Sequence, residues 1–117
     1  MSLATSICAI EDLVPNTGAC ALVNGRQVAL FRIVDQEGEQ FYAISNYDPF
    51  SAANVLSRGL IGSLQGQIVV ASPIYKQHFN LQTGLCLEDA SVSVDCWNVH
   101  TESGRIFIES QPTAQAA

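Results

Sequence analysis

Turn residues interrupt this chain so often that few segments are long enough to form a helix. The apolar stretches at 19–23 and 68–71 are only five and four residues long, and Val92, Val94 and Cys96 alternate with other residues. Such alternation is typical of a half-buried strand, and Asn24-Gly25 is a strong signal for a tight hairpin. Short strands joined by turns at this density predict an all-β antiparallel sandwich or barrel.

The remaining elements follow from the same signals. A loop rich in small residues is expected at 46–59, where Ser51 caps one helical turn that runs through Leu56. The segment 75–82 is expected to continue as a strand and hairpin that Thr83-Gly84 closes. The expected strands span 6–10, 19–23, 26–34, 41–45, 59–62, 67–71, 92–97 and 104–109.

The length of 117 residues and the composition, 48% apolar and 14% charged, suit one globular domain. We expect that domain to cover residues 1–110, followed by a disordered C-terminal tail at 111–117. Eleven acidic and five basic residues give a net charge of −6, which opposes binding to nucleic acid or to anionic membranes. No basic residue precedes Arg26, and no apolar run approaches the roughly 20 residues of a membrane span. These features predict a cytoplasmic protein.

The residues that could carry chemistry do not form a recognisable catalytic or metal-binding motif. The four cysteines contain no C-x-x-C pair, so we expect them to act as small hydrophobic residues. His78 and His100 lie in no nucleophile motif, and no glycine-rich loop could hold a dinucleotide. An enzyme that uses either histidine stays as one alternative, because catalytic partners can meet only in space.

The segment 72–84 resembles the second ligand motif of Rieske domains, C-P-x-H-G-W-x-F-x-L-x-T-G. Ser72 stands at the family's cysteine position, and Tyr75 stands at its histidine position. The framework of the motif is kept at Pro73, Phe79, Leu81, Thr83 and Gly84.

The first ligand loop of the Rieske pattern has changed in the same way. Asp48 falls at the cysteine position of that loop, and Phe50 falls at its histidine position. A Rieske cluster needs two thiolates on one iron and two imidazoles on the other. The resemblance therefore implies a Rieske-like sandwich or barrel with a small ligand-loop subdomain and no cluster. It also opposes the alternative function, a Rieske ferredoxin that carries electrons to a dioxygenase.

The altered positions and their surroundings resemble one subfamily, the small subunits of assimilatory NADH-dependent nitrite reductases. The resemblance runs from about residue 7 to residue 109 and is strongest at 44–50, 55–61, 70–73 and 79–89. It implies a large subunit as partner, with FAD, a [4Fe-4S] cluster and sirohaem, that passes electrons from NAD(P)H to nitrite and yields ammonium. This chain would then have no catalytic residue, metal or cofactor of its own.

In Rieske domains the two ligand loops form an exposed tip that meets redox partners. We expect this tip to dock on the large subunit, since aromatic side chains often anchor interfaces. The alternative is that Phe50 and Tyr75 turn inward and fill the space of the lost cluster. The predicted interface consists of Tyr47, Pro49, Phe50, Arg58, Ile74, Tyr75 and Lys76.

Overall fold

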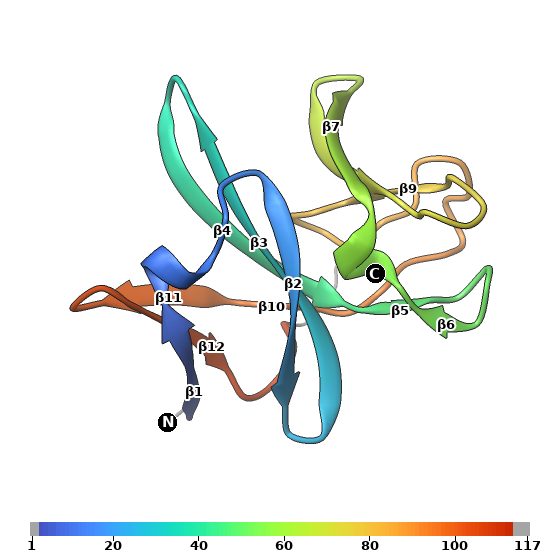
Figure 1. Cartoon of the computed structure of the whole chain (residues 1–117). Helices are drawn as coiled ribbons and strands as arrows, with labels where there is room; N and C mark the ends of the chain where they lie inside the picture. Colours follow the sequence, from blue (N-terminus) through green and yellow to red (C-terminus); the bar gives the residue numbers. More distant parts are fainter. Residues whose placement is uncertain (1–2, 114–117) are drawn as a thin grey trace.

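The computed structural model describes residues 3–113, which form short antiparallel strands and two single-turn 3₁₀ helices (Figure 1). In this part of the chain no helix has the length and apolar character needed to cross a membrane. The elements are β1 (Ala4–Ala9), η1 (Ile10–Asp12), β2 (Thr17–Val23), β3 (Arg26–Asp35), β4 (Gly38–Ser45), β5 (Tyr47–Asp48), β6 (Ala53–Asn54), η2 (Leu56–Arg58), β7 (Leu60–Leu64), β8 (Gln67–Ala71), β9 (His78–Asn80), β10 (Cys96–Trp97), β11 (Val99–Glu102) and β12 (Arg105–Glu109).

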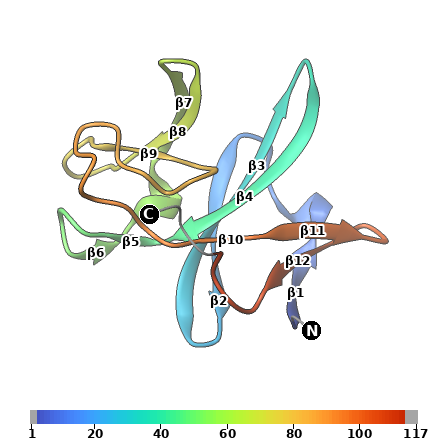
Figure 2. The same ribbon diagram turned by 180° about the vertical axis from the view of Figure 1, so that it is seen from behind.

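The strands form a base and a smaller subdomain. The base contains a four-stranded sheet in the order β10-β4-β3-β2 and a three-stranded sheet in the order β1-β12-β11. The subdomain contains the β7-β8-β9 sheet and the β5-β6 hairpin, and both views show β7-β8-β9 apart from β1-β12-β11 (Figures 1 and 2). The all-β prediction is confirmed, and the described sheets form a sandwich rather than a closed barrel.

Strand β3 lies between the two hydrophobic cores and contributes side chains to both. Val28 and Leu30 face the core of the base, whereas Ala29, Phe31 and Ile33 face the core of the subdomain. This division follows from the period of two residues in a strand. It also explains why the sequence of β3 is apolar at successive positions, as expected of a strand that is buried on both faces.

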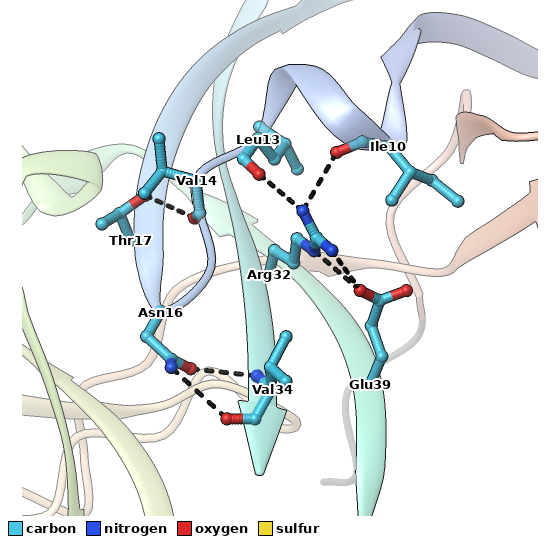
Figure 3. Close-up of polar contacts among 8 residues, drawn as sticks. All are labelled: Ile10, Leu13, Val14, Asn16, Thr17, Arg32, Val34 and Glu39. Carbon is cyan, nitrogen blue, oxygen red and sulfur yellow. Dashed lines mark hydrogen bonds and ion pairs between the residues drawn. The ribbon is translucent and has the colours of Figure 1, made fainter.

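A polar network joins the loop that follows η1 to β3 (Figure 3). The guanidinium of Arg32 donates to the carbonyl oxygen of Leu13 at 2.8 Å, and its Nε donates to Glu39 at 2.7 Å. The Asn16 amide bonds both backbone groups of Val34, at 2.9 and 3.3 Å. Backbone groups that no strand pairs are thus satisfied by side chains, which fixes the path of this loop.

The segment 46–59 differs from its prediction. The expected helical turn through Leu56 is wrong, because β6 occupies 53–54 and the single turn of η2 begins only at Leu56. Ser51 does not cap a helix, and its hydroxyl donates to Asp48 at 2.9 Å. The strand expected at 92–97 is also shorter than predicted and contains only 96–97.

The structure shows where the cysteines lie and how part of the C-terminal segment is bonded. Cys86 and Cys96 are buried as expected, but Cys20 is exposed. Thr113 lies within the segment predicted to be disordered, and its N–H donates to the carbonyl oxygen of Cys96 at 2.7 Å. Residues 114–117 of that segment lie outside the described residues.

The link between η2 and β7 leads to the first prediction, because Gly59 has no room for a side chain. A Cβ at Gly59 would collide with the carbonyl oxygen of Ala71 and with Val70, whereas a Cβ at Gly62 would meet nothing within 4 Å. Gly59→Ala should lower the free energy of unfolding by about 1–3 kcal/mol. Gly62→Ala is the matched control and should change it by less than about 1 kcal/mol. Urea denaturation checks both, and equal stabilities would contradict the close packing at Gly59.

Candidate functional site

The candidate site is the tip, which we define as the loops 46–54 and 72–77. The first loop contains the β5-β6 hairpin, and the second loop joins β8 to β9. The second loop closes on itself, because the N–H of Ser72 donates to the carbonyl oxygen of Gln77 at 2.9 Å and the N–H of Lys76 donates to that of Ser72 at 3.1 Å. Lys76 has a φ of 68°. This left-handed conformation is uncommon outside glycine, and here it belongs to a tight turn.

Asp48 and Ser72 join the two loops through a direct hydrogen bond. The Ser72 hydroxyl donates to Asp48 Oδ2 at 2.5 Å, and both residues are 0% exposed. Asp48 also accepts hydrogen bonds from the N–H of Phe50 and the hydroxyl of Ser51, each at 2.9 Å. The donors to this buried carboxylate are therefore two hydroxyl groups and one backbone N–H. Charge-assisted bonds of this kind are stronger than neutral ones, so they suit a group that has left water.

The residues at the tip do not fit a Rieske cluster. The sequence motif aligns Asp48 and Ser72 with the two cysteine positions of the Rieske pattern. Their oxygens are joined by a direct hydrogen bond of 2.5 Å, which leaves no place for an iron ion between them. Neither Phe50 nor Tyr75 offers the imidazole that the second iron requires. Among residues 3–113, moreover, no group of three or more His, Cys, Asp or Glu side chains could hold a metal ion.

Phe50 and Tyr75 have different positions. Phe50 is partly buried against the subdomain core, and its ring centroid lies 6.2 Å from that of Phe79 with the rings tilted by 50°. Tyr75 is 60% exposed. Of the two histidine positions of the Rieske pattern, one therefore holds a side chain that packs inward and the other holds a surface side chain.

The other predicted interface residues lie on the surface of both loops or close to them. Tyr47 and Ile74 are 44% and 46% exposed, and Pro49 and Lys76 are also exposed. Lys76 Nζ donates to the carbonyl oxygen of Pro73 at 3.2 Å, so its charge stays at the second loop. Arg58 is exposed in η2, outside both loops.

A pair that the sequence did not reveal lies directly after the second loop. His78 Nδ1 is 2.6 Å from Glu88 Oε2, and the His78 N–H donates to Glu88 Oε1 at 2.7 Å. Partial burial raises the pKa of Glu88, but the hydrogen bonds and charge of His78 outweigh it and hold that pKa below its usual value. The two residues are ten positions apart and follow no local spacing, so only the fold brings them together.

The surroundings of the histidines oppose the alternative of an enzyme that uses them. Cys86 lies next to the His78–Glu88 pair and donates to Glu88 at 3.7 Å, but burial raises the pKa of its thiol. Burial therefore favours the protonated thiol, which is a weak nucleophile. His100 lies on β11, in a different sheet from His78, and its ring stacks on that of Phe107 on the neighbouring strand β12, with ring centroids 5.1 Å apart.

The Asp48–Ser72 bond leads to a prediction on stability. Asp48→Ala leaves two hydroxyl groups and an N–H without their acceptor, so it should lower the free energy of unfolding by about 2–5 kcal/mol. Ser72→Ala removes one donor and should cost about 1–3 kcal/mol. The double variant should lose less than the sum of both, because the two residues share one interaction. Urea denaturation of the three variants measures this, and strict additivity would contradict the proposed coupling.

Known proteins resemble this chain over nearly its whole length. The family model of the Rieske-like [2Fe-2S] domain matches residues 4–109. The nitrite reductase (NADH) small subunit of Salmonella typhimurium is 50% identical over 104 residues, which are 89% of this chain and 94% of that relative. The crystal structure of a putative NADH-dependent nitrite reductase small subunit from Mycobacterium tuberculosis superposes with a TM-score of 0.86 at 42% identity, covering 93% of this chain and 96% of that one.

Two further likenesses differ in kind. A nitrite reductase [NAD(P)H] large subunit of Klebsiella oxytoca is 39% identical over 106 residues, which are 91% of this chain but only 11% of that protein. The ferredoxin of carbazole 1,9a-dioxygenase from Nocardioides aromaticivorans has a TM-score of 0.78 at 20% identity, which shows a shared fold alone. High identity over almost the full length therefore lies with the reductase subunits, and this chain belongs to the Rieske-like family of NADH-dependent nitrite reductase small subunits.

Proposed function

We propose that this chain is the non-catalytic small subunit of a cytoplasmic NAD(P)H-dependent nitrite reductase. It supports a large subunit that reduces nitrite to ammonium for nitrate assimilation. The observation that carries this proposal is the buried Asp48–Ser72 hydrogen bond, which joins the two residues that we align with the cysteine ligands of an electron-carrying relative. The electron-transfer groups, FAD, a [4Fe-4S] cluster and sirohaem, then belong to the large subunit.

The Klebsiella relative supports physical association with that subunit. There, a stretch similar to 91% of this chain is part of one polypeptide named as a large subunit. A domain that is separate in some organisms and covalently joined in another has to function close to the rest of that polypeptide. We therefore assign the large subunit as the partner of this chain.

We propose the tip as the docking surface. Tyr47, Ile74 and Tyr75 expose apolar and aromatic surface on its two loops. Residues of this kind anchor protein interfaces when a partner removes them from water. Lys76 adds a positive charge in a chain of net charge −6, so the tip suits an acidic patch on the partner.

The interior of the tip prepares it for this role. The Asp48–Ser72 bond and the contact of Phe50 with Phe79 hold the two loops in place before any partner arrives. A surface that is already ordered loses less conformational entropy on binding than a flexible loop does. In this proposal the residues at the ligand positions therefore have two tasks, because Asp48, Ser72 and Phe50 shape the tip and Tyr75 contacts the partner.

The first test compares the large subunit expressed with and without this chain. We expect nitrite-dependent oxidation of NADH or NADPH, or the content of FAD, iron and sirohaem, to be lower when the chain is missing. Adding the wild-type chain should restore the wild-type values. The Gly62→Ala variant should restore them equally well, because an added Cβ at Gly62 meets nothing within 4 Å. Equal turnover and equal cofactor content in both preparations would contradict the proposed function.

The second test places a charge on the tip. An Ile74→Asp/Tyr75→Asp double variant should bind the large subunit at least about tenfold more weakly, because two interface anchors typically cost more than 1.4 kcal/mol. Phe50 is left unchanged, since a charge there would disturb the subdomain core. Leu22→Asp is the control, because Leu22 is 66% exposed and lies on β2 of the base. Calorimetric titration measures binding, and an unchanged affinity of the folded double variant would exclude the tip.

A further inference from the structure

A second surface of the molecule lies between its two protruding hairpins. The β3-β4 hairpin and the β7-β8 hairpin rise on either side of a gap in both views (Figures 1 and 2). Side chains of both hairpins and of the segment around β9 line a groove of about 630 Å³ there. This volume lies in the range of ligand-binding clefts, about 300–1,000 Å³. The groove shares no lining residue with the tip.

The lining of the groove is polar in a particular way. Its polar residues are mostly amides, each of which can both donate and accept hydrogen bonds. Small-molecule pockets are lined mainly by hydrophobic and aromatic side chains, so this groove differs from them. Amide groups match the alternating N–H and C=O groups of an extended polypeptide backbone. The residues that could make such contacts are Gln36, Gln40, Gln67 and Gln82.

Two carboxylates give the groove its charge. Asp35 and Glu37 lie at the turn of the β3-β4 hairpin, both are exposed, and no Lys or Arg is among the described residues that line the groove. None of the ion pairs found in residues 3–113 includes either carboxylate. Their neighbour Glu39, by contrast, is paired with Arg32. The groove therefore opposes anions, which excludes nitrite and the phosphates of a dinucleotide as its ligands.

Hydrogen bonds hold the groove in its shape. Asn80, which is buried, donates to Gln67 at 2.7 Å and accepts from the N–H of Gln82 at 2.7 Å. At the turn, Asp35 accepts from the N–H of Glu37 at 2.8 Å. Each side of the groove is thus ordered by its own hydrogen bonds, which lowers the conformational entropy lost on binding.

We infer that this groove binds an extended, basic segment of the large subunit. The inference rests on the proposed function and adds a second contact to the one at the tip. The amides would bond the backbone of that segment, and Asp35 and Glu37 would pair with its Lys or Arg side chains. Two separate contacts on one partner would also raise the effective concentration of the second contact once the first has formed.

The test uses the complete complex and a variant that changes charge but not shape. Asp35→Asn/Glu37→Gln should weaken binding of the large subunit about threefold to thirtyfold at low salt, because each exposed ion pair contributes modestly. The loss should shrink as salt increases, since salt screens exposed charges. Glu11→Gln/Glu102→Gln removes the same charge from η1 and β11 of the base and should leave binding unchanged.

Two further measurements identify what occupies the groove. Hydrogen exchange at 33–42 and 63–68 should slow in the complex. A carbodiimide, which links carboxylates to amines without a spacer, should join Asp35 or Glu37 to a lysine of the large subunit, and the Asn/Gln variant should lose that link. Cross-links between two copies of this chain, or an affinity equal to that of the control variant, would overturn the inference while the proposed function stands. Failure of the wild-type chain to bind the large subunit at all would overturn both.

Discussion

A carboxylate that is buried without a cation must be satisfied by hydrogen bonds, and the tip is built around this requirement. Asp48 is fully buried and takes hydrogen bonds from both loops, from Phe50 and Ser51 on its own side and from Ser72 on the other. These donors fix the β5-β6 hairpin and the loop 72–77 relative to each other. The two residues that we align with the cysteine ligands of Rieske domains thus form a hydrogen-bonded pair, and this pair joins the two loops of the tip.

One strand, β3, connects the base to the subdomain. Because β3 is buried on both faces, it belongs to the core of the base and to the core of the subdomain at once. Any movement of β3 would disturb both cores, so the subdomain and the tip have a rigid support. The Arg32 and Asn16 contacts fasten the outer loop of the base to the far end of the same strand (Figure 3). The proposed docking at the tip would therefore depend on packing that lies well away from it.

Local signals in the sequence predicted the strands joined by tight turns better than the loops of the tip. Asn24-Gly25 correctly indicated the β2-β3 hairpin, because both residues adopt the positive φ that such a tight turn requires. The Rieske-like spacing predicts four altered ligand positions from the motif alone. The motif could not show the hydrogen bond between Asp48 and Ser72, which are 24 positions apart. Nor could it show that Phe50 is partly buried whereas Tyr75 is exposed. The bond and the two side-chain positions depend on the three-dimensional path of both loops. The strands of the first loop, β5 and β6, have only two residues each, which is too short to show a sequence pattern.

A tip that holds a hydrogen-bonded pair in place of a cluster can serve a different kind of protein contact from the one that an electron carrier needs. An electron carrier must release its partner quickly, which favours small and weak interfaces. A chain without a redox group gains nothing from rapid exchange, so its exposed aromatic residues are free to serve a lasting contact. A lasting contact also makes a second surface useful, because two modest contacts on one rigid body reinforce each other. The polar groove between the hairpins and the aromatic tip are consistent with this change, since hydrogen bonds order both surfaces before a partner binds.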